Sequence, residues 1–174
     1  TVAARHDPCH RTNRGMTAEN VAEQYGITSA MMDARAAESH RRAAHAIAEG
    51  RFKSQIVPVE IVSRKGTIVF DTDEHVKAST TVESLGKMKP AFKKEGGTVT
   101  AGNASGINDG AGAVVLASAA AVKAHGLKPL ARLVAYSHAG VEPTIMGIGP
   151  IPATRRVLER AGLSIKDLDV IESN

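Results

Sequence analysis

Small and apolar residues recur with a helical period in the first fifty residues of the chain. Five alanines lie three, four or seven positions apart: Ala30, Ala34, Ala37, Ala44 and Ala48. This spacing predicts that they share one face of a helix that begins at Thr28 or Ser29 and runs to Gly50. A shorter helix is predicted before it, with Thr17 as the N-cap and Gly26 as the stop.

Two runs of β-branched residues follow, at 56–62 and 67–70. The residues 64–66 between them offer turn chemistry, so the pattern predicts a β-hairpin. Pro58 confines the first run to the edge of a sheet, because proline donates no backbone hydrogen bond. A short helical turn is predicted at 82–85.

Strand and helix patterns alternate from about Ala113 to the last printed residue. The predicted strands cover 113–116, 130–136 and 169–172, and the predicted helices cover 118–125 and 152–161. This order is typical of an α/β fold. Because the last predicted strand lies at the end of the printed sequence, we expect a piece of a longer sheet.

The composition restricts the core and the class of partner. Hydrophobic residues make up 43% of the chain and aromatic residues 3%, so a core must form from Ala, Val, Ile, Leu and Met. The formal net charge of +4 is small and scattered, whereas nucleic-acid-binding proteins usually carry a clustered basic face. No apolar run approaches the roughly 20 residues that span a bilayer, and no secretory signal is visible. We therefore expect a cytoplasmic protein with no nucleic-acid or membrane partner.

The Gly-rich stretch that starts at Gly97 is the first candidate for chemistry. Gly97 and Gly102 have the spacing of a phosphate-binding loop, but Asn103 and Ala104 stand where that motif needs Lys and Ser or Thr. Two interpretations of the Gly-rich stretch remain. The stretch is either a structural turn or a wall of small residues against which a ligand lies, with the Ser105 hydroxyl to orient it.

Residues 1–14 are polar and show no period, so we expect a disordered tail or a foreign leader. His6, Cys9 and His10 in this segment are capable of binding a metal, but a structural zinc site needs four ligands and the chain offers no second pair. Cys9 is the single cysteine, which excludes an internal disulfide and fits a reducing compartment. A tail would give Cys9 neither burial nor an oxyanion hole, so we predict neither a metal site nor a nucleophile here.

Five stretches of the chain closely resemble the thiolase family, in the family's order and at about its spacing. They are Met16-Thr-Ala-Glu-Asn-Val-Ala-Glu23, Gly50-Arg-Phe-Lys-Ser-Gln-Ile-Val-Pro-Val59, Lys89-Pro-Ala-Phe92, Thr98-Val-Thr-Ala-Gly-Asn-Ala-Ser-Gly-Ile-Asn-Asp-Gly-Ala111 and Met146-Gly-Ile-Gly-Pro-Ile-Pro-Ala153. The chain looks most similar to bacterial short-chain 3-ketothiolases of the biosynthetic type. The resemblance implies a partial thiolase fold of the α/β class.

The resemblance also implies a domain organisation. Residues 15–106 correspond to the family's loop domain, which covers the active site and holds coenzyme A. Residues 107–129 correspond to the end of the N-terminal thiolase half, and residues 130–174 to the start of the C-terminal half. Residues 1–14 fall outside this scheme. The full-length enzymes of the family imply a homotetramer.

Coenzyme A contacts are implied first in the loop domain. Lys77 and Ser84 correspond to positions near the adenine and its phosphates, where the family often has Arg at the first of the two. A lysine there would meet phosphate as a point charge. Ala91 and Phe92 correspond to one wall of the tunnel that holds the pantetheine arm.

The other implied contacts lie further along the chain. Ala101, Ser105 and Ile107 correspond to the second wall of the pantetheine tunnel, with Ser105 bonding an amide. Met146 corresponds to a pocket residue beside the reacting acyl group. Asn174 corresponds to an asparagine that holds a water in an oxyanion hole, which makes it the catalytic residue implied here. Neither a metal nor a cofactor beyond the coenzyme A thioester substrates is implied.

Some family motifs are not among the printed residues. The family's nucleophilic Cys segment, its Gly-His-Pro segment and its second Cys have no counterpart, Asn13-Arg14 replaces a His-Met pair, and Gly96-Gly97 carries one residue more than usual. We expect a thiolase-type acyltransferase that acts on acetyl-CoA and 3-ketoacyl-CoA through a Cys thioester. In this expectation, the printed chain supplies coenzyme A-binding parts and is inactive alone. The alternatives are a truncated, non-catalytic coenzyme A-binding fragment and an unrelated α/β binding module.

Overall fold

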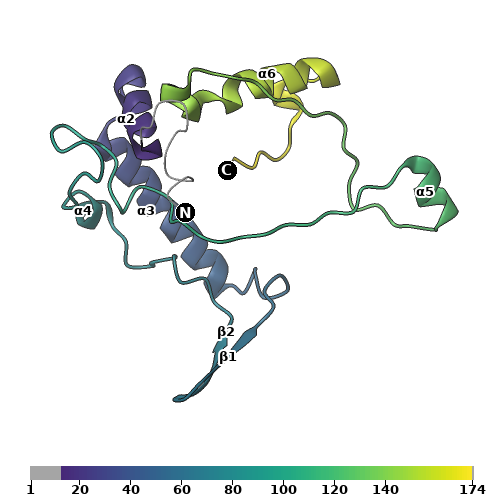
Figure 1. The fold of residues 1–174 in the computed structure, drawn as a ribbon, viewed down its shortest axis with the longest axis horizontal. Helices are drawn as coiled ribbons and strands as arrows, with labels where there is room; N and C mark the ends of the chain where they lie inside the picture. Colours follow the sequence, from purple (N-terminus) through teal and green to yellow (C-terminus); the bar gives the residue numbers. More distant parts are fainter. Residues whose placement is uncertain (1–12, 174) are drawn as a thin grey trace. The chain divides into compact units, whose positions relative to one another are not determined.

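The computed structural model describes residues 13–173 (Figure 1). The chain divides into two compact units between Gly106 and Ile107. The resemblance predicts the end of the loop domain at the same position. None of the described helices is long and apolar enough to cross a membrane.

The first helix of the first unit is α2, Arg14–Tyr25. It begins one turn earlier than the sequence predicted. The Asn13 side chain accepts a hydrogen bond from Gly15 N at 2.9 Å, which makes Asn13 the N-cap. Thr17, the predicted cap, lies buried inside the helix and donates from Oγ1 to Arg14 O at 2.7 Å. The predicted end is confirmed, because Gly26 takes the left-handed conformation with φ 64°.

Arg14 therefore belongs to a helix and not to the expected N-terminal tail. The expectations for residues 1–12, including those for His6, Cys9 and His10, lie outside the described residues. The same holds for the catalytic role implied for Asn174.

Helix α3, Ser29–Ala48, confirms the long predicted helix, with Thr28 as its N-cap. Three of the five alanines that were predicted to share a face, Ala30, Ala34 and Ala48, are exposed. The one residue of α3 that is buried is Asp33, at 3% exposure. Its Oδ1 accepts a hydrogen bond from Asn103 Nδ2 at 3.0 Å, so the buried carboxylate has a polar partner.

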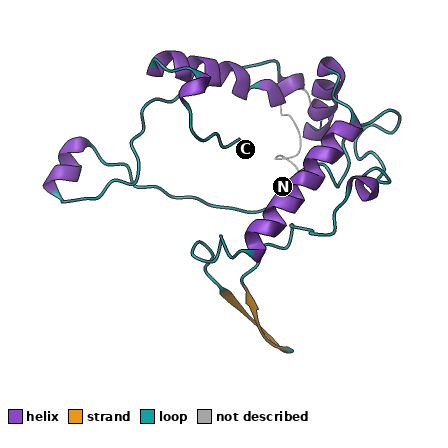
Figure 2. Ribbon diagram, turned by 180° about the vertical axis from the view of Figure 1, so that it is seen from behind, coloured by secondary structure: helices purple, strands orange, loops and turns teal. Residues whose placement is uncertain are grey.

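The predicted hairpin is confirmed. Strands β1, Val59–Ser63, and β2, Gly66–Phe70, pair antiparallel, and Ser63 lies opposite Gly66 (Figure 2). The first strand begins three residues later than predicted, directly after Pro58, which has no N–H to donate. Large apolar side chains of both strands stay exposed, so the hairpin adds nothing to the core.

Helix α4, Val82–Leu85, follows the hairpin and confirms the predicted short turn. It packs against α3. Among the described residues, the buried apolar side chains are Ala22 of α2, Leu85 of α4 and Val99. The core of the first unit is therefore small, and it lies along residues 98–102, which contact α2 through Glu19 and α4 through Leu85.

The second unit contains short helices. They are α5, Ala119–Ala124; η1, Pro143–Ile148; α6, Pro150–Ala161; and η2, Ile165–Asp167. Both predicted helices are confirmed, with Ser118 as the N-cap of α5 and Gly162 ending α6 at φ 66°. Two arginines of α6 donate to backbone carbonyls of the preceding segment, Arg156 to His138 O at 3.2 Å and Arg160 to Tyr136 O at 3.0 Å.

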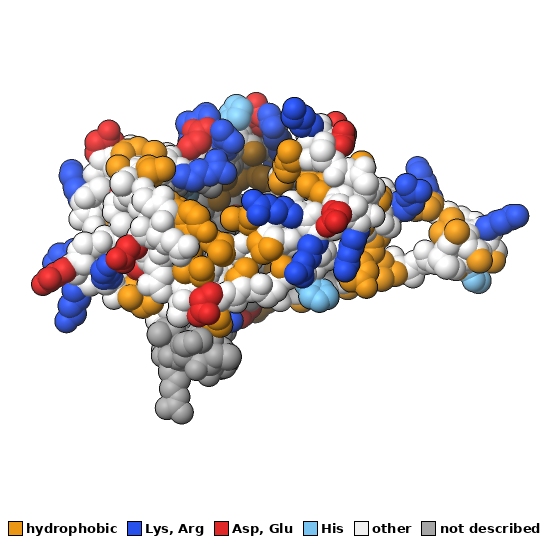
Figure 3. All heavy atoms as spheres, turned by 90° about the horizontal axis from the view of Figure 1, so that it is seen from above, with side chains coloured by type: hydrophobic (Ala, Val, Ile, Leu, Met, Phe, Trp, Pro, Cys, Tyr) orange, Lys and Arg blue, Asp and Glu red, His pale blue; other side chains and the backbone are white. Residues whose placement is uncertain are grey.

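The three strands predicted in the second unit do not form. Residues 113–116, 130–136 and 169–172 have no strand assignment, and Val115 and Leu130 are 93% and 101% exposed. A strand exists only when a neighbour completes its backbone hydrogen bonds, and none of the described segments of this unit pairs with these runs. Many large apolar side chains are consequently on the surface (Figure 3).

Candidate functional site

Two segments that the resemblance assigned to the pantetheine tunnel lie side by side in the first unit. Pro90 and Thr100 form an antiparallel β-bridge. Ala91 N donates to Val99 O at 2.8 Å. The segment with Ala91 is thereby paired with the segment that leads into Ala101. These two walls were predicted separately, and the backbone pairing joins them.

The ring of Phe92 packs against the first turn of α2. A methyl group added at Gly15 would overlap this ring at Cε2, Cζ and Cδ2, so the absence of a side chain at Gly15 lets the ring approach the helix. Phe92 keeps 37% of its surface exposed. The ring that the resemblance implies as a tunnel wall thus contacts α2 and keeps part of its surface accessible.

A buried carboxylate bonds residues 98–99, which lead into Ala101 of the second wall. Glu19 of α2 is 4% exposed. Its Oε2 accepts from Thr98 N and from Thr98 Oγ1, both at 2.8 Å, and its Oε1 accepts from Val99 N at 3.0 Å. Lys93 also contributes a nearby positive charge. These bonds tie the beginning of the Gly-rich stretch to α2.

Asn103 holds the same stretch from its other end. Its Nδ2 donates to Asp33 Oδ1 at 3.0 Å and to Thr98 O at 2.9 Å, and its Oδ1 accepts from Thr100 N at 2.8 Å. The Thr100 hydroxyl oxygen accepts from Asn103 N at 3.3 Å. Every hydrogen-bonding group of the Asn103 carboxamide is engaged except one lone pair of its oxygen.

Sequence reasoning missed Glu19 and Asp33. A usable signal existed for Asp33, which lies three residues after Ala30 and four before Ala37, on the face predicted to be apolar. An acidic residue on such a face indicates a buried polar partner. Glu19 carried no comparable signal, because its partners are two backbone N–H groups nearly eighty positions away.

The hydrogen bonds at Glu19 favour its ionised form. Burial by itself raises the pKa of this carboxyl group. The bonds from Val99 and Thr98, together with the charge of Lys93, outweigh burial and hold the pKa of Glu19 below its ordinary value.

This shift predicts that acid weakens the first unit. A carboxyl group whose pKa is lowered by folding stabilises the fold above its unfolded pKa of about 4.3, and this contribution is lost as the pH falls through the folded pKa. At pH 7, Glu19→Gln should lower the free energy of unfolding by about 1–2 kcal/mol. The difference should shrink below about pH 4.

Urea unfolding of the whole protein between pH 3 and pH 7 measures this difference. Glu23→Gln is the matched control, because Glu23 lies one turn further along α2 and is exposed, with only a surface ion pair to Lys93 at 3.2 Å. A Glu19→Gln difference that stays constant over this pH range would show that ionisation of Glu19 does not support the fold.

The two residues implied near the adenine lie on the surface. Lys77 is exposed, and its backbone N donates to His40 Nδ1 at 3.2 Å. The Ser84 hydroxyl takes part in the capping box of α4, accepting from Thr81 N at 3.1 Å and donating to Thr81 O at 2.8 Å. One lone pair of Ser84 Oγ is left to accept a hydrogen bond from a ligand.

The remaining predicted residues are less constrained. Ser105 is exposed, two positions after Asn103. Ile107 and Met146 belong to the second unit, where they are 74% and 44% exposed. The structure therefore brings together the walls at 91–92 and 98–101, and it leaves the placement of Ile107 and Met146 as a prediction.

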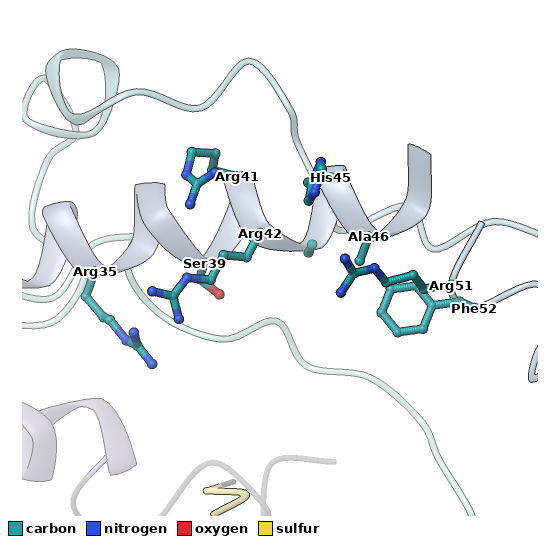
Figure 4. Close-up of a pocket in the computed structure, with 9 residues that line it drawn as sticks. Arg35, Ser39, Arg41, Arg42, His45, Ala46, Arg51 and Phe52 are labelled. Atoms are coloured by element: carbon teal, nitrogen blue, oxygen red, sulfur yellow. The ribbon is translucent and has the colours of Figure 1, made fainter. Parts of the chain in front are cut away.

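The first unit also contains two hollows. One, of about 490 Å³, runs along α3 and is lined by Arg35, Ser39, Arg42 and Phe52, among others (Figure 4). Glu38 pairs with Arg42 at 2.6 Å and neutralises part of its charge. The other, of about 300 Å³, is lined by both residues of the β-bridge, Pro90 and Thr100, and by Asp33, Leu85 and Gly97, among others. The described part of the chain holds no cluster of three side chains suited to a metal.

Comparison with known proteins covers nearly the whole chain. The sequence model described as "Thiolase, N-terminal domain" matches residues 2–120, and that described as "Thiolase, C-terminal domain" matches residues 127–174. The first match includes most of the segment 1–14, so the comparison gives no support to a foreign origin for these residues.

Individual relatives agree with the family match. The chain is 60% identical to the beta-ketothiolase BktB of Cupriavidus necator over 173 residues, which is 99% of this chain and 44% of that protein. It is 54% identical to the acetyl-CoA acetyltransferase of Escherichia coli over 165 residues, 95% of this chain and 42% of that protein. The chain thus spans less than half the length of these relatives.

Solved structures show the same likeness. The acetyl-CoA acetyltransferase of Bacillus anthracis matches with a TM-score of 0.89 and 50% identity, over 97% of this chain and 43% of that chain. Human mitochondrial 3-ketoacyl-CoA thiolase in complex with CoA matches with a TM-score of 0.85 and 46% identity, over 97% and 42%. The predicted fold class is confirmed at this level, as part of an α/β thiolase fold, although three of the predicted strands are unpaired in this chain.

Proposed function

This chain belongs to the thiolase family, and on that premise we propose that the whole protein transfers acyl groups between coenzyme A thioesters. Its substrates are acetyl-CoA and a 3-ketoacyl-CoA, which it condenses or cleaves. The printed residues contribute a large part of the coenzyme A site. The observation that carries this proposal is the match of both thiolase domains in order along one chain, with identities of 50–60% to enzymes named for this activity.

The proposed reaction proceeds through an enzyme thioester, as the resemblance implies. A cysteine thiolate accepts the acyl group and releases coenzyme A, and a second cysteine removes a proton from acetyl-CoA. An oxyanion hole stabilises the enolate, and Asn174 contributes to it through a water. The enolate carbon then attacks the enzyme thioester, which forms the new carbon–carbon bond and frees the thiolate.

The residues of the first unit bind the coenzyme in this proposal. Lys77 meets a phosphate, and Ser84 lies near the adenine. Ala91 and Phe92 on one side, with Ala101 and Ser105 on the other, line the pantetheine arm. Small residues suit this role because a thin arm needs close approach to the backbone. The paired backbone at Ala91 and Val99 supports it, since both walls then move as one body.

Other properties are proposed from the same resemblance. We propose that Ile107 belongs to the second wall of the pantetheine tunnel and that Met146 lies beside the reacting acyl group. We also propose that the enzyme needs no metal or further cofactor, and that it works in the cytoplasm as a homotetramer. Gel filtration of the whole protein with light scattering tests the tetramer directly.

Ser105→Ala tests the proposed site. One neutral hydrogen bond contributes about 0.5–1.5 kcal/mol, so KM for coenzyme A should rise by about 2- to 12-fold. Because the hydroxyl bonds substrate and transition state alike, kcat should stay nearly level. Steady-state kinetics of 3-ketoacyl-CoA cleavage measures both constants. An unchanged KM would remove Ser105 from the site.

A second candidate function is coenzyme A binding without catalysis. It is favoured by one fact, namely that the printed residues contain a single cysteine, Cys9. Finding the family's cysteine and Gly-His-Pro segments in the coding sequence on either side would decide against it. Their absence there, with coenzyme A binding retained, would decide for it.

A further inference from the structure

We propose that Glu19 and Asp33 are positioning residues for coenzyme A. In this proposal they touch no substrate and act by fixing the backbone between Thr98 and Ser105. The inference rests on the proposed function, because it concerns the wall that the proposal assigns to the pantetheine arm.

Glu19 fixes the start of this wall. The carboxylate accepts three close hydrogen bonds from Thr98 and Val99, and Val99 O in turn accepts from Ala91 N. One buried group on α2 therefore sets the position of both walls. Hydrogen bonds to a charged group are the stronger kind, and breaking them leaves buried N–H groups unpaired.

Asp33 fixes the end of the wall through Asn103. Asn103 stands midway between Ala101 and Ser105, and its carboxamide bonds Asp33, Thr98 and Thr100 at once. The orientation of this amide follows from its partners, since Asp33 and the Thr98 carbonyl both need a donor. The loop is thus closed on itself and anchored to α3 by a single acceptor, Asp33 Oδ1.

The hydrogen bonds of Glu19 and Asp33 fix a segment whose small residues cannot fix it themselves. Ala101 and Gly102 carry no polar side chain to anchor their own backbone, and Ser105 must keep its hydroxyl free for a ligand. The anchoring groups therefore come from α2 and α3, beneath the wall. A shift of about 1 Å at such a wall is enough to lose a ligand hydrogen bond.

Titration calorimetry of coenzyme A into the whole protein tests the inference. Glu19→Gln puts an amide donor opposite the Thr98 and Val99 donors and should weaken binding by roughly tenfold or more.

Asn103→Asp places a second carboxylate against that of Asp33 and should weaken coenzyme A binding similarly. Adding Asp33→Asn should restore part of the affinity. If Glu19→Gln does not fold, Thr98→Val removes one of the three bonds and should weaken binding by about threefold.

A double-mutant cycle separates positioning from general stability. If Glu19 acts through the segment that carries Ser105, Glu19→Gln should cost less affinity in the Ser105→Ala background than alone. Thr28→Ala is the matched control, because it removes the N-cap of α3 without touching the wall. It should lower the melting temperature and leave the affinity unchanged.

The outcomes are distinct. Wild-type affinity in Glu19→Gln, or equal losses in Glu19→Gln and Thr28→Ala, would overturn the positioning role and leave the proposed function standing. A whole protein that does not bind coenzyme A would overturn the proposed function, and this inference with it.

Discussion

The 174-residue chain by itself should give no thiolase turnover. Acyl transfer through an enzyme thioester needs a thiolate beside hydrogen-bond donors that face the developing oxyanion. Cys9 is the single thiol among the printed residues, and no family cysteine motif surrounds it. Removing members of a catalytic unit lowers the rate by factors of about 10⁴–10⁶ in other covalent enzymes. The rate of the purified chain should therefore fall below detection.

The measurement is the cleavage of acetoacetyl-CoA by free coenzyme A, followed by chromatography of the acetyl-CoA formed. The whole protein serves as the positive control, and Cys9→Ser of the chain is the matched variant. If the chain shows turnover and Cys9→Ser abolishes it, Cys9 is a nucleophile. The proposal that the printed residues supply coenzyme A-binding parts without catalysis would then be wrong.

Local signals were sufficient for the helices and turns. Gly26 ends α2 and Thr28 caps α3, each as predicted, and α5 begins directly after Ser118, where its helix was predicted to start. Each of these signals acts within one turn of the chain, so the sequence contains it completely. The start of α2 was missed because two good N-caps compete, and Asn13 lies one turn ahead of Thr17.

Strands and the site depend on groups far away in the sequence. The runs at 113–116 and 130–136 have the composition of buried strands, but composition does not supply the neighbour that completes their hydrogen bonds. The resemblance named the wall residues. The support beneath them, from Glu19 and Asp33, became visible only in three dimensions, since it joins positions about 70–80 apart.

The largest loss of stability from one methyl group is expected at Gly97. A side chain there would overlap the backbone oxygen of Lys93, approach Pro90 Cβ to 2.8 Å and lie 3.2 Å from Glu19 Oε1. Backbone atoms cannot rotate away, so relief requires moving the β-bridge or the Glu19 network. Gly97→Ala should lower the free energy of unfolding by about 2–3 kcal/mol, the cost of overpacking a closely packed site.

Two further glycines make this prediction specific. At Gly102 an added methyl group would overlap Leu85 Cδ2 and lie 2.5 Å from Met88 Sδ, which are the ends of flexible side chains, so Gly102→Ala should cost less. At Gly110 nothing lies within 4 Å and the backbone is not left-handed, so Gly110→Ala should be neutral or slightly stabilising. Urea unfolding of the three variants measures the order. Equal stability of the Gly97 and Gly110 variants would mean that the backbone at 97–105 shifts at little cost in free energy. A backbone that shifts so easily could not hold the pantetheine arm of coenzyme A in one position.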